Sequence, residues 1–151
     1  MEIKQIVDKH GRTPDKLIGI MLECQDCSAL NYLTSEDVLS IAKEMNVPES
    51  RVFSLASFYS MLSVEPRGKY IIRLCNDVPC YINGSINLKE ELENTLGIKM
   101  GETTEDKMFT LEFSSCLGCC DKAPVMQIGD TVYSGLNREK LSSILADYRR
   151  K

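Results

Sequence analysis

Five of the seven cysteines in this 151-residue chain fall in two short segments. Cys75 and Cys80 are separated by four residues in LCNDVPC, and Cys116, Cys119 and Cys120 lie together in SSCLGCCDKAP. Thiolates bind zinc and iron–sulfur clusters, and in a reducing compartment clustered cysteines more often bind metal or exchange electrons than form structural disulfides. The two segments are therefore the candidate site.

The spacing of these cysteines bears on which metal they could bind. Structural zinc sites favour ligand pairs about two to four residues apart on tight turns, which C-x4-C and C-x3-C satisfy only loosely. A [2Fe-2S] cluster is larger and needs two sulfurs at each iron, so wider pairs suit it better. The spacing favours a cluster over zinc, and it does not decide which of Cys119 and Cys120 is a ligand.

A third chemistry is open because Cys116-Leu117-Gly118-Cys119 is a literal C-x-x-C, the pattern of thiol–disulfide exchangers. The attacking cysteine of such proteins usually lies at the start of a helix, whose dipole lowers its pKa. Here Asp121 and Pro124 follow at once, and the next predicted element is a strand. This pattern weakens the exchanger hypothesis without removing it.

Gly118 lies among these three thiols and has two interpretations. It could let the backbone turn tightly and direct amide hydrogens at sulfur, which helps to set a reduction potential. It could equally be an ordinary turn glycine.

Composition and charge narrow the class of protein. With 43% apolar and 26% charged residues the chain can bury a core, and a net charge of −4 gives no general attraction to nucleic acid. We expect a cytoplasmic protein with no membrane insertion, because neither a secretory signal nor a long apolar run is present. The sequence has no GxGxxG, P-loop or Ser/His/Asp set, so we expect a non-catalytic chain and a nicotinamide site on another subunit.

The first sixty or so residues predict four short helices, because apolar residues recur there at helical spacing. The third is expected to begin at the cap Thr34 and to end at Asn46, and the fourth to run from Pro48 through Leu62. Three aromatic side chains of the fourth helix are expected to pack within this helical unit: Phe53, Phe58 and Tyr59.

At Glu65-Pro66-Arg67-Gly68 the apolar period changes to that of a strand, which predicts an α+β chain with domains at residues 1–66 and 67–151. The second part is expected to run strand, helix, strand, strand, strand, helix, with Gly129-Asp130 as a hairpin turn. The first cysteine pair follows one strand into a proline-containing loop, and the second segment follows another strand. Parallel strands place such loops together, so all these thiols could converge.

The two cysteine segments carry a family resemblance. RLCNDVPC followed by FSSCLGCCDKAPVMQIGDTVYSGL resembles the thioredoxin-like [2Fe-2S] ferredoxin subunit of the NADH dehydrogenase module of complex I. Similar subunits occur in NAD-dependent formate dehydrogenases and electron-bifurcating [FeFe]-hydrogenases. NVPESRVFSLASFYSMLSVEPRGKY and GIKMGETTEDKMFTLEFSSC extend the resemblance over about residues 13 to 148.

The resemblance implies a small helical bundle that docks on a partner, followed by a thioredoxin-like α/β domain. It assigns one [2Fe-2S] cluster to Cys75, Cys80, Cys116 and Cys120, and makes Cys119 a bystander where the family has a small residue. It further implies an electron-transfer subunit that exchanges single electrons near a flavin-bearing, NADH-oxidising partner subunit, with further iron–sulfur subunits in the complex. A zinc-stabilised thioredoxin-like binding module and a thiol–disulfide exchanger are the alternatives, and the sequence does not say which complex is served.

Cys24 and Cys27 form a second C-x-x-C that the family pattern does not require. Their spacing places both thiols on roughly one face at the end of the second predicted helix. We expect a structural role, since buried cysteine behaves as a small hydrophobe. A redox-sensitive pair or a site completed by a partner chain are the alternatives, and the sequence also leaves open whether Pro124 follows a cis peptide bond.

Overall fold

The computed structural model describes residues 2–150 of the chain. It divides into two compact units between Arg67 and Gly68, and each has its own hydrophobic core. The change of apolar period in the sequence predicts a boundary one residue earlier, between residues 66 and 67.

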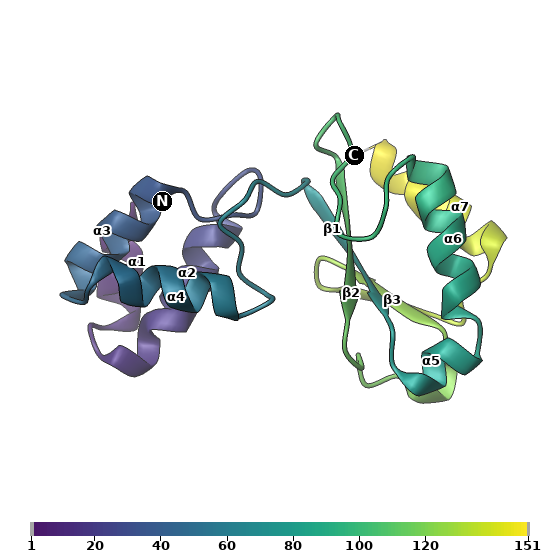
Figure 1. The fold of residues 1–151 in the computed structure, drawn as a ribbon, viewed down its shortest axis with the longest axis horizontal. Coiled ribbons are helices and arrows are strands. Elements are labelled where there is room, and N and C mark those ends of the chain that lie inside the picture. Colours follow the sequence, from purple (N-terminus) through teal and green to yellow (C-terminus); the bar gives the residue numbers. More distant parts are fainter. Residues whose placement is uncertain (1, 151) are drawn as a thin grey trace. The chain divides into compact units, whose positions relative to one another are not determined.

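The first unit consists of helices (Figure 1). They are α1 (Ile3–His10), the short 3-10 helix η1 (Pro14–Lys16), α2 (Leu17–Asp26), α3 (Ser35–Met45) and α4 (Glu49–Phe58). Their apolar stripes meet in one core whose most buried members are Ile6, Val7, Ile20, Met21, Ile41 and Val52. No helix among residues 2–150 is long and apolar enough to cross a membrane.

The ends of α3 follow from its capping residues, as the sequence predicts. The Asp37 backbone N–H donates to Thr34 Oγ1 at 3.1 Å, and the Thr34 N–H donates back to the Asp37 carboxylate at 2.8 Å. This reciprocal pair satisfies N–H groups that would otherwise lack partners at the helix start. Asn46 ends the helix in the left-handed conformation, with φ of 52°.

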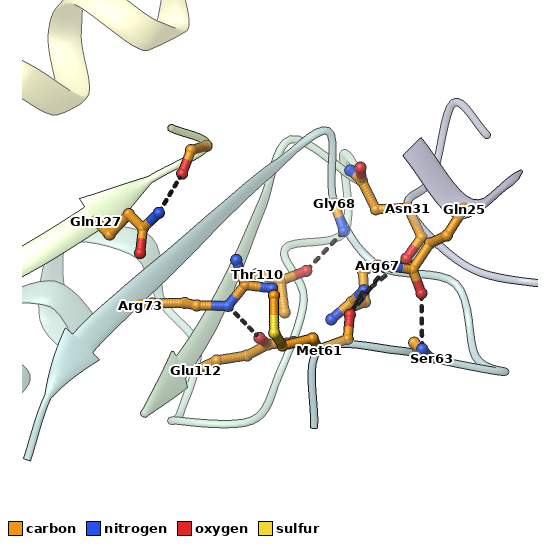
Figure 2. A network of polar contacts seen from close by, with 11 residues as sticks. Gln25, Asn31, Met61, Ser63, Arg67, Gly68, Arg73, Thr110, Glu112 and Gln127 are labelled. Atoms are coloured by element: carbon orange, nitrogen blue, oxygen red, sulfur yellow. Dashed lines mark hydrogen bonds and ion pairs between the residues drawn. The ribbon is translucent and has the colours of Figure 1, made fainter. Parts of the chain in front are cut away.

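Helix α4 ends at Phe58, four residues before Leu62, so the predicted length is wrong at this end. The buried Gln25 of α2 explains the difference: its side-chain amide donates to Met61 O at 3.0 Å and accepts from Ser63 N–H at 2.8 Å (Figure 2). These backbone groups are satisfied without further helix. A partner so distant in the sequence leaves no local signal.

The aromatic side chains at the end of this unit are exposed, contrary to the expectation that they pack inside it. Phe53 is 53% exposed, Phe58 78% and Tyr59 40%. Helix α4 buries only Val52 and Ala56, which are four residues apart on one narrow stripe. Phe53 and Phe58 fall on its other faces and Tyr59 follows its last residue, so this end of the unit presents apolar surface outward.

The second unit is a four-stranded sheet with helices. Its elements are β1 (Tyr70–Cys75), α5 (Val78–Ile82), α6 (Ser85–Leu96), β2 (Phe109–Ser114), the 3-10 helix η2 (Cys120–Lys122), β3 (Val125–Ile128), β4 (Thr131–Ser134) and α7 (Arg138–Arg149). The strand order is β2-β1-β3-β4, with β1 parallel to β2 and the other neighbours antiparallel. This mixed sheet is consistent with the predicted α+β, thioredoxin-like fold, and Gly129-Asp130 forms the predicted hairpin turn.

One face of this sheet is covered by helices, and the other carries polar residues and Cys75. Ile72 and Leu74 of β1 pack in a core with residues of α6 and α7, and both helices lie along this face (Figure 1). Because side chains alternate along a strand, Arg73 and Cys75 lie on the opposite face. There Arg73 forms an ion pair with Glu112 of β2 at 3.3 Å (Figure 2).

Helix α5 is an element that the sequence interpretation misses. It occupies Val78–Ile82, where the sequence predicts a loop, so Cys80 is held by a helix. Asp77 precedes it as N-cap residue and Pro79 lies in its first turn, where proline is tolerated because that N–H has no partner in the helix. The same proline is equally typical of a loop, which is why this start signal is ambiguous in the sequence.

Gly68, at the start of the second unit, lies close to the backbone of β2. A Cβ placed there would be 2.7 to 2.9 Å from Phe109 backbone atoms, closer than side-chain contacts allow. We expect Gly68→Ala to lower the free energy of unfolding by roughly 1–3 kcal/mol, because neither backbone can yield cheaply. Urea unfolding followed by circular dichroism measures this change.

Gly19 in α2 is the matched control. A Cβ there would lie 3.7 Å from the His10 ring, its nearest neighbour, which is ordinary contact. Gly19→Ala is expected to stabilise the chain by about 0.4–1 kcal/mol through helix propensity and unfolded-state entropy. Equal and small effects from both substitutions would contradict the close approach at Gly68.

Candidate metal centre

Parallel pairing of β1 and β2 brings the two cysteine segments to one edge of the sheet. Cys75, the last residue of β1, is paired in register with Ser114, the last residue of β2. The next residue of the first segment continues this contact, because the Asn76 N–H donates to Ser114 O at 3.1 Å. The loop that holds Cys116 and Cys120 therefore starts beside Cys75.

Cys75 and Cys80 form the buried pair. Each is 1% exposed, and they pack with Val125 in a small cluster of their own. Burial raises the pKa of the Cys80 thiol, and its hydrogen bond with Cys75 raises it further. A hydrogen bond from the Val125 backbone acts in the opposite direction by favouring the thiolate.

Cys116 and Cys120 form the exposed pair. Their Sγ atoms are 3.1 Å apart, and both residues are accessible to solvent. The hydrogen bond with Cys116 is the largest cause that raises the pKa of Cys120, to about 11, followed by desolvation. The charge of Cys116 adds to this, because two neighbouring thiolates repel one another.

The two pairs lie within electrostatic reach of each other. Cys116 contributes to the raised pKa of Cys80, and both Cys75 and Cys80 contribute to that of Cys120. Among residues 2–150, no three His, Cys, Asp or Glu side chains are gathered as ligands around a single ion. The four sulfurs form two hydrogen-bonded pairs, Cys75 with Cys80 and Cys116 with Cys120, and a two-iron cluster takes two thiolates at each iron. This donor set fits a [2Fe-2S] cluster.

Gly118 acts on this site through its backbone. Its N–H donates to Cys116 Sγ at 3.4 Å, and its φ of +81° lies in the region that favours glycine. The structure thus supports the first of the two interpretations of this residue, a tight turn that directs an amide hydrogen at sulfur.

Cys119 lies beside the site. It is half-buried, serves as the N-cap residue of η2 and packs against the cluster of Cys75, Cys80 and Val125. After η2, which spans three residues, the chain enters β3. The C-x-x-C of Cys116 and Cys119 therefore does not begin an α-helix, as a typical exchanger would require.

Val125 is a site residue that the sequence interpretation misses, since an apolar residue gives no signal of a hydrogen bond from its backbone. It follows Pro124, and the Ala123–Pro124 peptide bond is cis.

Cys24 and Cys27 belong to the first unit. Cys24 is 8% exposed, and burial raises its pKa to about 12, which agrees with the expected structural role, while Cys27 is exposed.

Exposed apolar side chains lie on two elements that carry or lead into the cysteine segments. Val78, Tyr81 and Ile82 of α5 are 69%, 54% and 75% exposed, and Phe113, near the end of β2, is 46% exposed. Large apolar side chains that gather at a surface mark interaction sites more often than isolated ones do. The elements that position the thiols thus also present apolar surface.

Comparisons with known proteins indicate the kind of cofactor. A profile of the thioredoxin-like [2Fe-2S] ferredoxin family matches residues 3–149, almost the whole chain, which implies a [2Fe-2S] cluster. The second E-type subunit of the NADH-quinone oxidoreductase of Rhizobium meliloti is 42% identical over 147 residues, which cover 97% of this chain and 88% of that protein. The E-type subunit of the same enzyme in Rickettsia felis is 42% identical over 108 residues, covering 72% of this chain and 65% of that protein, less than two thirds of its length.

Solved structures share the fold. A crystal structure of an NAD+-reducing [NiFe]-hydrogenase in the air-oxidised state has a TM-score of 0.78 at 19% identity, covering 94% of this chain and 24% of that one. The H2-reduced state of such an enzyme gives a TM-score of 0.81 over 93% of this chain and 23% of that one. With the family profile and the identity to the Rhizobium meliloti protein, these findings lead to one conclusion. The chain belongs to the thioredoxin-like [2Fe-2S] ferredoxin family.

Proposed function

We propose that the chain is an electron-transfer subunit of an NADH-linked, multi-subunit oxidoreductase and carries one [2Fe-2S] cluster in its second unit. The convergence of the buried pair and the exposed pair at one edge of the sheet carries the proposal. The relatives from NADH-quinone oxidoreductases support its assignment to an NADH-oxidising complex. A bound [2Fe-2S] cluster accepts and donates one electron at a time.

The proposed ligands are Cys75 and Cys80 at one iron and Cys116 and Cys120 at the other. The 3.1 Å contact between Cys116 and Cys120 favours this pairing over one that uses Cys119. The buried pair anchors the site to the sheet, and the Gly118 N–H supplies a hydrogen bond to the Cys116 sulfur. The exposed pair lies where an electron can reach a partner over a short path.

The partner proposed for the second unit is a flavin-bearing, NADH-oxidising subunit. The exposed apolar side chains of α5 and of Phe113, which we call the α5 rim, lie on elements that carry or lead into the cysteine segments. A partner that covered the α5 rim would bring its own electron acceptor or donor next to the exposed pair and would remove apolar surface from water. Geometry and surface chemistry therefore favour docking at this edge.

The first unit is proposed to hold the complex together. A groove of about 550 Å³ runs between α3, α4 and the segment that follows α4. It is lined by Leu33, Ser35, Val38, Leu39, Glu49, Ser50, Phe53, Val64 and Glu65. Its charged lining residues are two glutamates, so an amphipathic helix with apolar anchors and basic flanks is the complementary partner segment.

We expect Cys120→Ser to destroy or alter the cluster and Cys119→Ser to leave it nearly intact. The first substitution removes one of two sulfurs at an iron, whereas the second removes a packing neighbour. Anaerobically purified wild-type chain should hold about two iron and two sulfide and be reddish-brown. Iron, zinc and sulfide analyses and visible spectra of the three proteins measure this.

The opposite pattern, a lost cluster in Cys119→Ser with a normal one in Cys120→Ser, would reverse the ligand assignment. A wild-type chain with stoichiometric zinc and no iron would establish the zinc-stabilised module instead. Disulfide reduction by an iron-free chain, lost in both Cys116→Ser and Cys119→Ser, would establish the exchanger.

We expect the double substitution Leu39→Ser, Phe53→Ser to weaken assembly at least tenfold without changing iron content. Both side chains line the groove and are about half exposed, so their loss removes contact area while the core stays filled. Tagged full-length chain is purified from its own cells, and bound flavin and NADH-dependent ferricyanide reduction are measured in the product.

Phe58→Ser is the matched control, because this side chain lies on the same helix, is 78% exposed and is not among the groove's lining residues. It should retain flavin and activity at the wild-type level. An equal loss from the control would assign binding to the general apolar surface of α4 and not to the groove.

A further inference from the structure

Ser114 combines a position beside the proposed cluster with an unsatisfied polar group. It is the last residue of β2, lies in register with Cys75 of β1 and precedes Cys116 by two residues. Side chains of residues paired across neighbouring strands lie on the same face of a sheet. The Ser114 hydroxyl therefore shares its face with the Cys75 thiol, opposite the face that α6 and α7 cover.

The hydroxyl of Ser114 is buried and has no partner. Among the side-chain nitrogen and oxygen atoms of residues 2–150, its Oγ is the one buried atom without a hydrogen bond. Its neighbour Ser115 is exposed, and Thr110 of the same strand has a partner in Thr103 at 2.8 Å. A buried hydroxyl without a hydrogen bond is destabilising, so its presence here calls for an acceptor that the polypeptide does not supply.

A cluster at the four thiols would supply that acceptor. The proposed ligands flank Ser114 on two sides, since Cys75 is its partner across the sheet and Cys116 follows in the same chain segment. Iron-bound thiolates and inorganic sulfides are anionic and accept hydrogen bonds better than a neutral thiol does. Both kinds of sulfur suit a hydroxyl donor.

We propose that the Ser114 hydroxyl donates a hydrogen bond to a sulfur on the Cys75 side of the cluster and thereby raises its reduction potential. This inference rests on the proposed function, since it needs the cluster to be present. Reduction adds one negative charge, and a donor aimed at sulfur stabilises the more negative state more strongly. Ser114 is thus a positioning residue for electron transfer, and it would tune the potential without serving as a ligand.

The test compares the reduction potentials of wild-type, Ser114→Ala, Ser114→Thr and Ser115→Ala chains by dye-mediated titration of the holoprotein, followed by electron paramagnetic resonance of the reduced cluster. Loss of the donor should shift the ratio of oxidised to reduced cluster at fixed potential roughly three- to tenfold toward oxidised. For a one-electron couple this equals a fall of about 28 to 59 mV, at 59 mV per decade.

Threonine keeps the hydroxyl, so Ser114→Thr should stay near the wild-type potential, and Ser115→Ala should not move it because that residue is exposed. Resonance Raman spectra in heavy water add a direct reading. The deuterium shift of the iron–sulfur stretching bands should be smaller in Ser114→Ala than in the wild type and unchanged in Ser115→Ala.

Stability of the cluster-free chains separates this role from a structural one. Removing an unsatisfied hydroxyl should leave the melting temperature of apo Ser114→Ala equal to or above that of the apo wild type, whereas a packing role would lower it. An iron-loaded Ser114→Ala chain with the wild-type potential and the wild-type deuterium shift would overturn the inference. So would loss of the cluster in both the alanine and the threonine variants. An iron-free wild-type chain would instead overturn the proposed function.

Discussion

The resistance of gathered thiols to losing their protons is the constraint that the second unit must overcome. Burial raises the pKa of Cys80 and the hydrogen bond with Cys116 raises that of Cys120, and repulsion between neighbouring thiolates adds to both. The thiols therefore cannot hold their own arrangement, and the scaffold must do so. It does this with a parallel strand pair and with a core that holds the sheet against α6 and α7. Metal binding to such a preformed set would release protons and relieve the repulsion.

The pairing register between β1 and β2 determines where the two cysteine segments lie relative to each other. A slip of one residue would move Ser114 and the start of the second cysteine loop to the other face of the sheet. That face carries the apolar side chains that α6 and α7 cover, so a slip would also bury polar residues and expose apolar ones. The hydrophobic core thus fixes the relative position of the two cysteine segments, although its own side chains lie on the other face of the sheet. The same packing therefore stabilises the fold and sets the geometry of the site.

The fold is predictable from sequence wherever a pattern is local, and less so elsewhere. The capping pair of Thr34 and Asp37 and the strand runs that end at Cys75 and Ser114 carry short-range signals, and the converging cysteines follow from these strands. The end of α4 depends on a side chain from a different helix. Spacing does not separate Cys120 from Cys119, whereas the family resemblance and the contact with Cys116 both favour Cys120. The unsatisfied hydroxyl of Ser114 is invisible in a sequence, since partners across a sheet and burial are both properties of the fold.

Hydrogen bonds from the sheet and water at the exposed pair would both affect the reduction potential of the proposed cluster. On the sheet side, Ser114 and the Val125 backbone offer hydrogen bonds that favour negative charge on sulfur, and a partner does not alter them. On the open side, water around the exposed pair also stabilises added charge. A subunit that covers the α5 rim would remove this water and so lower the reduction potential. Hydrogen-bond donors in the sheet would then be the main remaining groups that stabilise the reduced cluster. This role would offset the destabilisation caused by burying the Ser114 hydroxyl without a partner in the polypeptide.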